Sequence, residues 1–248
     1  LSGQSCDMRV ISDLGRQYGF RIIEDASHAI GGYYRNVPVG SCSYSDITVF
    51  SFHPVKIITT GEGGMALTNN RELAQRMTLL RSHGITRDPK QMTKKPEGPW
   101  YYEQLELGFN YRMTDIQAAL GFSQMARLEE FVARRNELAL VYDKALEKHC
   151  VQRQSISEDT LSSRHLYLIR ISAQIHLKIF KSLRGKGIGI GLHYMPVHLQ
   201  PYYRTLGYKD GHFPEAEAYS KEAISLPLYP DLTDGEQAHI ITTLKKLI

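Results

Sequence analysis

Three polar residues near the ends of two apolar segments have the types and spacing to do chemistry together. Asp25 follows the apolar pair at residues 22–23, and Ser51 lies in the apolar stretch 47–52, shortly before Lys56. A deprotonated lysine amine is a nucleophile, a carboxylate favours a protonated neighbour, and a hydroxyl can donate to a phosphate. Singly, such an aspartate is more often a turn former and such a lysine a surface residue.

Together these residues meet the needs of a pyridoxal 5'-phosphate site. That cofactor requires a lysine for covalent attachment, a carboxylate beside its pyridine nitrogen and donors for its phosphate. We assign Lys56, Asp25 and Ser51 to these roles. The carboxylate raises the pKa of the ring nitrogen, so that the protonated ring withdraws electrons from a substrate carbanion. Lys56 is the predicted catalytic residue because its released amine can move a proton.

Two neighbouring motifs leave alternatives open. The glycine-rich residues 61–64 could be only a tight turn that needs positive φ. Ser27 and His28 adjoin Asp25, but consecutive strand residues point to opposite faces and no G-x-S-x-G motif is present, so a hydrolase is not predicted. His28 is either a ring beside the cofactor or a buried, hydrogen-bonded histidine.

Metal and disulfide sites are not predicted. His193 and His198 flank Pro196 at a spacing that matches no strong zinc motif. The cysteines are odd in number, far apart and without a C-x-x-C spacing, which favours a reducing cytoplasm; they are Cys6, Cys42 and Cys150.

Helical and extended patterns alternate in the first half of the chain. Asp25 ends one of the expected strands, and ligands gather at the carboxyl ends of strands in open α/β sheets. The hydrophobic spacing predicts helices over residues 7–18 and 71–83, and strands at residues 21–23, 47–52 and 65–68.

The second half begins after a lysine- and proline-rich loop at residues 86–100. Thr114 and Asp115 predict the start of a long helical region that breaks near Leu128 and bridges two domains. The expected order is then strand 166–171, helix 175–186, strand 188–194 and helices from Pro214 and Thr233. The prediction is an α/β fold in which residues 1–127 form part of a large mixed-sheet domain that binds the cofactor. Residues 128–248 form a bridging helix and a small α+β domain.

Composition excludes several classes of function. The 248 residues are 42% hydrophobic and 23% charged, and no apolar run reaches the roughly 18 residues of a membrane span. The net charge of +4 is spread along the chain without blocks of like charge, so neither a nucleic acid nor a membrane is an expected partner. No signal peptide is recognisable at the first residues.

Four blocks of sequence resemble, in order, the DegT/DnrJ/EryC1/StrS sugar aminotransferases. These blocks are residues 23–29, 50–64, 81–85 and 107–119. The resemblance covers effectively the whole chain and implies a fold type I pyridoxal-phosphate-dependent transferase that takes its amino group from L-glutamate. It also implies a homodimer with active sites at the subunit interface.

The same resemblance implies roles for individual residues. Lys56 resembles the cofactor lysine, Asp25 the partner of the pyridine nitrogen, His28 the residue beside the ring, and Ser51 a phosphate ligand. Asn110 resembles the asparagine that reaches the cofactor phosphate of the neighbouring subunit, although it could also be a turn or capping residue. A related dehydratase branch has histidine in place of the lysine, which argues against that branch here.

Further segments narrow the expected substrate. Residues 51–56, 100–103, 163–167 and 193–198 are most similar to the transaminase branch of pseudaminic acid biosynthesis. This implies a UDP-linked 4-keto-6-deoxy-N-acetyl hexose as acceptor and UDP-4-amino-4,6-dideoxy-N-acetyl-β-L-altrosamine as product, with His193 and Tyr194 at the substrate.

Two alternatives remain beside this substrate. One is another nucleotide-linked keto sugar, such as the precursor of UDP-4-amino-arabinose. The other is a catalytically silent truncated module, because members of the family normally begin with a longer segment that carries a glycine-rich phosphate loop.

Overall fold

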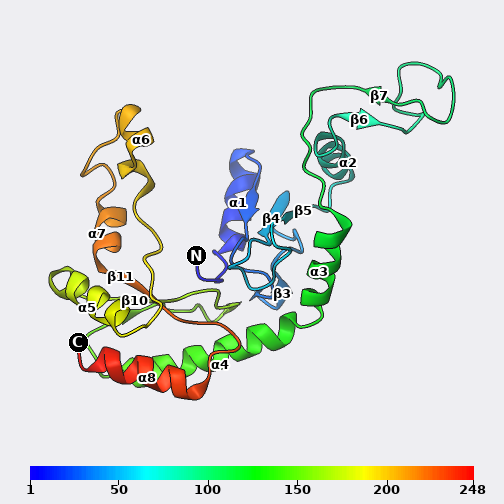
Figure 1. The fold of residues 1–248 in the computed structure, drawn as a ribbon. Helices are drawn as coiled ribbons and strands as arrows, with labels where there is room; N and C mark the ends of the chain where they lie inside the picture. Colours follow the sequence, from blue (N-terminus) through cyan, green and yellow to red (C-terminus); the bar gives the residue numbers. More distant parts are fainter. The chain divides into compact units, whose positions relative to one another are not determined.

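A computed structural model describes residues 1–248, which divide into two compact units (Figure 1). The N-terminal unit comprises Ser5–Ile30 and Val37–Arg127. The C-terminal unit comprises Leu1–Gln4, Gly31–Asn36 and Leu128–Ile248.

A mixed three-stranded sheet forms the centre of the N-terminal unit. Its order is β1 (Ile23–Asp25), β4 (Ile47–Ser51), β5 (Gly64–Leu67). Strands β1 and β4 are parallel, with Asp25 opposite Val49, whereas β4 and β5 are antiparallel, with Ser51 opposite Gly64. The carboxyl ends of β1 and β4 therefore lie at the same edge of the sheet.

Helix caps define the helices of the N-terminal unit. Asp7 caps α1 (Met8–Tyr18), and the helix ends at Gly19, whose φ of 72° suits glycine. Asn70 caps α2 (Arg71–Leu80) by accepting two backbone N–H groups. Thr114 and Gln117 form a capping box at the start of α3 (Asp115–Met125). The short strands of this unit are β3 (Val37–Pro38), β6 (Ile85–Thr86) and β7 (Glu103–Gln104).

The C-terminal unit is built around an antiparallel sheet with β10 in the middle. The strand order is β11 (Ala223–Leu226), β10 (Tyr167–Arg170), β8 (Gln152–Arg153). In this unit β2 (Tyr33–Tyr34) also pairs with β9 (Thr160–Leu161), outside that sheet. The helical elements are α4 (Leu128–Leu146), α5 (Ala173–Gly185), η1 (Val197–Leu199), α6 (Pro201–Thr205), α7 (Pro214–Glu222) and α8 (Asp234–Lys245).

The largest hydrophobic cluster lies in this unit, where α4, α5 and α8 pack on β10 and β11. Its fully buried members include Leu138, Tyr142, Ile169, Ile224 and Leu244. Burial of such side chains stabilises by about 1.5–3 kcal/mol each, which makes this cluster the main source of stability of the unit.

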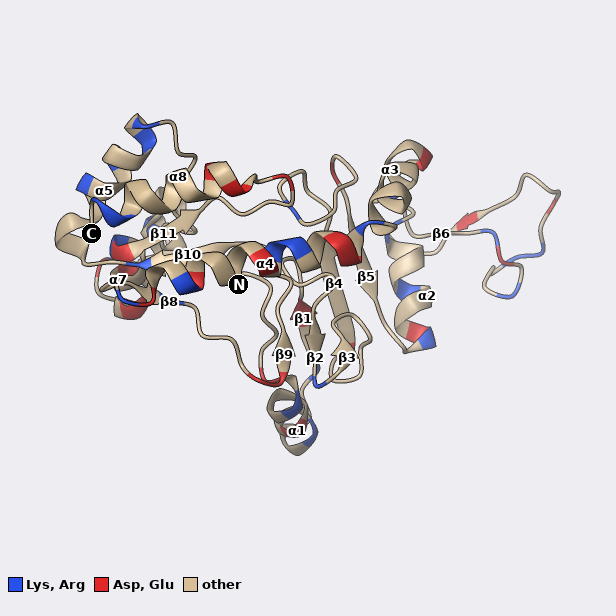
Figure 2. Cartoon of the chain, turned by 90° about the horizontal axis from the view of Figure 1, so that it is seen from below, with Lys and Arg blue, Asp and Glu red and all other residues tan.

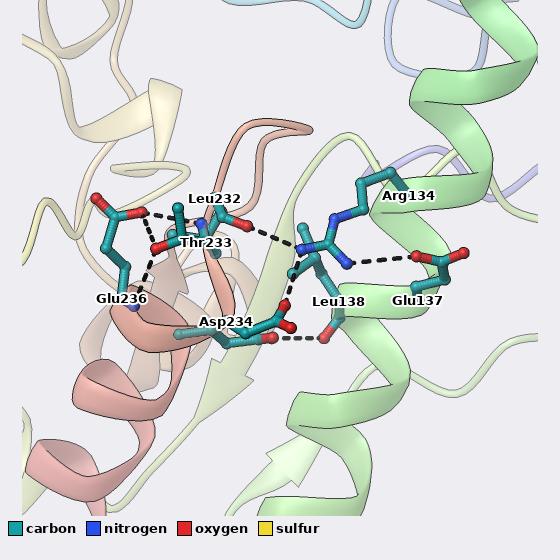
Figure 3. Close-up of polar contacts among 8 residues, drawn as sticks. Arg134, Glu137, Leu138, Leu232, Thr233, Asp234 and Glu236 are labelled. Atoms are coloured by element: carbon teal, nitrogen blue, oxygen red, sulfur yellow. Dashed lines mark hydrogen bonds and ion pairs between the residues drawn. The ribbon is translucent and has the colours of Figure 1, made fainter.

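Polar contacts join α4 to the start of α8 beside that core (Figure 3). Arg134 donates to Asp234 at 3.0 Å and to the Leu232 carbonyl at 3.0 Å. Buried Gln237 donates to the Leu138 carbonyl at 2.7 Å. Exposed ion pairs contribute little, so these contacts mainly fix how α8 lies along α4.

Most of the expected elements are confirmed, and one is wrong. The long helical region is interrupted where expected, because α3 ends at Met125 and α4 begins at Leu128. The strand expected at residues 188–194 is absent: only Gly191 bridges to Ser225, and a tight turn joins Ile188 to Ile190. Glycines alternate through this segment and weaken extended pairing, so its two isoleucines are buried without forming a strand. Strand β11, which sequence patterns did not predict, pairs with β10 instead.

Acidic and basic residues occur in both units. Helices α2 and α4 each carry basic and acidic side chains (Figure 2). None of the helices has the length and apolar character needed to cross a membrane.

Two leucines on α4 provide a matched test of where the core lies. Leu138 is 1% exposed and Leu140 is 65% exposed. Leu138→Ala should lower the free energy of unfolding by about 3–5 kcal/mol because it leaves a cavity, whereas Leu140→Ala should change it by less than about 0.5 kcal/mol. Urea denaturation measures both. Equal losses would contradict the burial of this helix face.

Candidate active site

Asp25 stands at the carboxyl end of β1 and is fixed by the residues that follow it. The Ser27 backbone N–H and hydroxyl both donate to Asp25 Oδ1, at 3.0 and 2.5 Å. These hydrogen bonds, aided by the positive charges of His28 and Lys56, hold the pKa of the Asp25 carboxyl below its usual range. The group is therefore an anion at neutral pH.

Lys56 lies beyond the end of the neighbouring strand β4 and is half-buried. Burial lowers the pKa of its amine, and the negative charge of Asp25 opposes that shift. Each group thus changes the pKa of the other. Both follow or end strands of the parallel pair β1 and β4, at the same edge of the sheet. A less basic amine is more often neutral and hence more nucleophilic.

Residues 52–63, here called the Lys56 loop, are closed at their base by Phe52. The Phe52 N–H donates to the Gly63 carbonyl at 2.8 Å. The Phe52 carbonyl in turn accepts from the Thr60 N–H and the Thr59 hydroxyl, both at 3.0 Å. Inside the loop, the Lys56 N–H donates to the His53 carbonyl at 2.9 Å. The backbone that carries Lys56 is therefore held from both ends.

Glycine is required where the loop returns to β5. Gly61 has a φ of 80°, which side chains rarely adopt. A Cβ on Gly63 would collide with the Thr60 hydroxyl, and one on Gly64 would lie 2.7 Å from the Phe50 carbonyl. The glycine-rich residues thus form a tight turn, and that turn is also the support of the Lys56 loop.

Ser51 and His28 lie at the same edge of the sheet. Ser51 is the last residue of β4, is half-buried, and accepts a long hydrogen bond of 3.4 Å from the His53 N–H. His28 follows β1, is half-buried rather than enclosed, and its charge acts on Asp25. The N-terminal unit therefore brings four of the predicted residues together.

Asn110 is exposed and lies in the segment before α3. It forms an antiparallel bridge with Ser82, and its side-chain oxygen accepts from Arg112 at 3.3 Å. Thr114, not Asn110, caps α3. The side chain thus bonds within its own segment.

His193 and Tyr194 belong to the C-terminal unit. His193 Nδ1 and the buried Ser225 hydroxyl are 2.6 Å apart, and the Tyr219 hydroxyl donates to the His193 carbonyl at 3.1 Å. The ring of Tyr194 stacks edge-on against that of His193 and is exposed. His193 is therefore fixed by its neighbours, whereas Tyr194 offers a free aromatic surface.

Sequence reasoning missed two residues that support the site. Ser27 was considered only as a nucleophile, although its role is to hold Asp25. Gln117 was not assigned any role, although its side chain donates to the Glu62 carbonyl in the Lys56 loop at 2.9 Å. The Thr-x-x-Gln spacing is a capping-box signal that could have drawn attention to Gln117.

Other chemical groups do not gather into a second centre. No group of three or more His, Cys, Asp or Glu side chains is placed to hold a metal ion. All three cysteines are free thiols: Cys6, Cys42 and Cys150.

Comparison with known proteins defines the class of fold and then the family. Putative sugar aminotransferase Spr1654 from Streptococcus pneumoniae, in its PMP-form, superposes with a TM-score of 0.89 at 31% identity, over 100% of this chain and 67% of that one. A PLP-form of the same protein superposes with a TM-score of 0.85. The fold is that of the fold type I pyridoxal-phosphate-dependent transferases. The model of the DegT/DnrJ/EryC1/StrS aminotransferase family matches residues 1–245, and the chain belongs to this family.

Relatives show similarity over the whole of this chain. It is 39% identical, over 100% of its length, to the uncharacterized protein MJ1066 of Methanocaldococcus jannaschii, of which it covers 65%. It is 36% identical, over 99% of its length, to the UDP-4-amino-4,6-dideoxy-N-acetyl-beta-L-altrosamine transaminase of Campylobacter jejuni, of which it covers 63%. The chain thus spans a little less than two thirds of the length of these relatives.

The depressed pKa of Lys56 predicts its reactivity with an amine-acylating reagent. Lys56 should be labelled at lower pH than an ordinary lysine, whose pKa is about 10.4. Asp25→Asn removes the charge that favours the protonated amine, so labelling should begin at still lower pH, while the asparagine oxygen can still accept from Ser27. Competitive labelling followed by mass spectrometry measures this, with exposed Lys181 as internal reference. Labelling of Lys56 in parallel with Lys181 at every pH would count against the site.

Proposed function

We propose that this chain supplies the catalytic lysine and the cofactor-binding carboxylate of a pyridoxal-phosphate-dependent nucleotide-sugar aminotransferase. The observation that carries the proposal is the position of Asp25 and Lys56 at the carboxyl edge of two parallel strands, where the charge of each also affects the pKa of the other. This edge is where open α/β sheets bind ligands. Family membership supports the same chemistry.

The residues at this edge fit the cofactor by the chemistry of their donors. Lys56 offers a partly desolvated amine for covalent attachment, and Asp25 an anion whose orientation Ser27 fixes. Ser51 offers a hydroxyl for a phosphate, and His28 a half-buried ring. Bound pyridoxal phosphate would supply an electron-withdrawing ring that stabilises negative charge at the substrate carbon.

The protein's own part in catalysis is to hold and move protons. Asp25 would keep a pyridine nitrogen protonated, because its lowered pKa keeps it negative at neutral pH. The Lys56 amine would take up and return the proton at the reacting carbon, and burial makes this amine less basic than that of an ordinary lysine. In this scheme residues 1–127 contribute to the cofactor-binding domain and residues 128–248 form the bridging helix and small domain.

The proposed reactants are L-glutamate as amino donor and a UDP-linked 4-keto-6-deoxy-N-acetyl hexose as acceptor. The product is then UDP-4-amino-4,6-dideoxy-N-acetyl-β-L-altrosamine, for surface or flagellar glycans. The name of the Campylobacter jejuni relative supports this choice. His193 and Tyr194 are the proposed sugar contacts, because His193 is fixed by Ser225 and the ring of Tyr194 is exposed.

An exposed apolar surface supports a homodimer. Around Asn110, the rings of Phe109 and Tyr111 stack at 4.8 Å and are open to solvent. Leu107, in the same segment, and Ile116 and Phe122, in α3, are 88%, 84% and 83% exposed. Exposed large apolar side chains that gather in one part of a chain favour an interaction site. A second copy of the chain is the proposed occupant, with Asn110 directed to the cofactor phosphate of the partner.

Activity tests the proposed function directly. The chain, and in parallel the chain extended by the matching N-terminal segment of the Campylobacter jejuni relative, is supplied with pyridoxal phosphate, L-glutamate and the keto sugar. Mass spectrometry should detect 2-oxoglutarate and the aminated sugar. Lys56→Ala should reduce turnover by at least about 1,000-fold because no other amine replaces the nucleophile, whereas Lys181→Ala should retain it. Full turnover by Lys56→Ala would exclude the assignment, and amination of only a UDP-linked keto-pentose would exclude the proposed sugar.

Light scattering tests the dimer. The chain should have twice the mass of one copy at micromolar concentration, and Ile116→Lys should shift it to the monomer because a charge is costly inside an apolar interface. Leu177→Lys, on exposed α5, is the matched control and should leave the mass unchanged. A wild-type monomer throughout this range would refute the dimer.

A further inference from the structure

The start of α3 lies against the Lys56 loop along one side. Gly121 is four residues from Gln117 in α3, so the two share a side of the helix, and Met113 directly precedes the cap residue Thr114. A Cβ on Gly121 would lie 2.7 Å from the Thr60 methyl group, and one on Gly63 would lie 2.9 Å from the end of Met113. Loop and helix are therefore in close contact, with Gln117 between the two apolar contacts.

Gln117 uses both ends of its side-chain amide. Its oxygen accepts from the N–H and the hydroxyl of Thr114, both at 3.0 Å, which completes the cap of α3. Its nitrogen donates to the Glu62 carbonyl at 2.9 Å. One side chain thus joins the start of α3 to the Lys56 loop.

The Glu62 carbonyl accepts hydrogen bonds from inside and outside the Lys56 loop. It accepts from the Thr60 hydroxyl at 2.7 Å, and the next carbonyl, that of Gly63, accepts from the Phe52 N–H that closes the loop. Rotation of the Glu62–Gly63 peptide would break the bonds from Thr60 and Gln117 to the Glu62 carbonyl and would disturb the backbone next to the Gly63 carbonyl. Restraining this peptide therefore restrains the backbone on both sides of Lys56.

We propose that Gln117 is a positioning residue, which holds the Lys56 loop against α3 so that the Lys56 amine stays beside Asp25. The inference deepens the proposed function, because it names a residue that orients the catalytic lysine without touching substrate or cofactor. It also links the segment that bears Asn110 to the loop that bears Lys56, since Thr114 follows Asn110 closely in the chain.

Capping of α3 explains the hydrogen bonds that the side-chain oxygen of Gln117 accepts from Thr114. It does not explain the bond that the side-chain nitrogen donates to the Glu62 carbonyl. Glutamate completes capping boxes as well as glutamine does. Gln117→Glu therefore keeps the cap of α3, removes the donor to Glu62 and places a negative oxygen against its carbonyl. The reverse exchange, Glu236→Gln, alters the same position of the Thr233 capping box in α8 and is the matched control.

Hydrogen exchange of the full chain without cofactor is the decisive measurement. In Gln117→Glu the amides of Phe52, Lys56 and Thr60 should exchange about 5- to 10-fold faster, the change that loss of one hydrogen bond produces. The amides of α3 should keep their wild-type rates. In Glu236→Gln the loop should exchange as in the wild type. Pyridoxal phosphate, monitored by its visible absorbance, should dissociate faster from Gln117→Glu than from the wild type or from Glu236→Gln.

The outcomes separate this inference from the proposed function. Loop amides that exchange at the wild-type rate in Gln117→Glu, or faster exchange confined to α3, would show that Gln117 only caps the helix. A wild-type chain that binds no pyridoxal phosphate would overturn the proposed function, while the loop exchange would still decide the role of Gln117.

Discussion

The electrostatic interaction between the Asp25 carboxylate and the Lys56 amine is the interaction on which the proposed site depends. It opposes the effect of burial: desolvation disfavours the charged lysine, and the nearby anion favours it. The balance leaves the amine less basic than an ordinary lysine while the carboxylate stays ionised. This balance of effects on the pKa persists only if the distance between the two groups is fixed. The backbone that carries Asp25 and the backbone that carries Lys56 must therefore both be held in place.

Two kinds of restraint provide this rigidity. Asp25 is held by the parallel pairing of β1 with β4 and by two hydrogen bonds from Ser27. Lys56 lies outside regular structure, and its loop is held by bonds to Phe52 and by close contact with the start of α3. A lysine on a free loop would sample many positions and would lose part of the advantage of being placed beside its partner.

Sequence patterns predicted the features that depend on local residues. The apolar runs gave β1, β4 and β5, and the position of Asp25 at a strand end followed directly. The break between α3 and α4 was predicted within a few residues. Strand β11 and the irregular backbone of residues 188–194 were not predicted. The strand that pairs with β10 is selected by packing between distant parts of the chain, which local patterns do not record.

The supporting contacts of the site were the least predictable. Gln117 and Glu62 are separated by 55 positions in the chain, and no spacing rule connects a helix start to a loop carbonyl at that distance. Ser27 was overlooked for a different reason. A serine hydroxyl beside a histidine suggested a nucleophile, whereas in the structure this hydroxyl donates to the nearby Asp25. The side chains proposed to act in catalysis were thus easier to select from the sequence than the residues that contact them.

Identifying the lysine that carries the cofactor tests the proposed site most directly. The chain would be incubated with pyridoxal phosphate, reduced with borohydride to make the attachment permanent, digested and analysed by mass spectrometry. The peptide containing Lys56 should carry the phosphopyridoxyl group, and Asp25→Asn should weaken this labelling without moving it to another lysine. Stable attachment at another lysine, or none at any lysine, would contradict the assignment of this edge of the sheet as the active site.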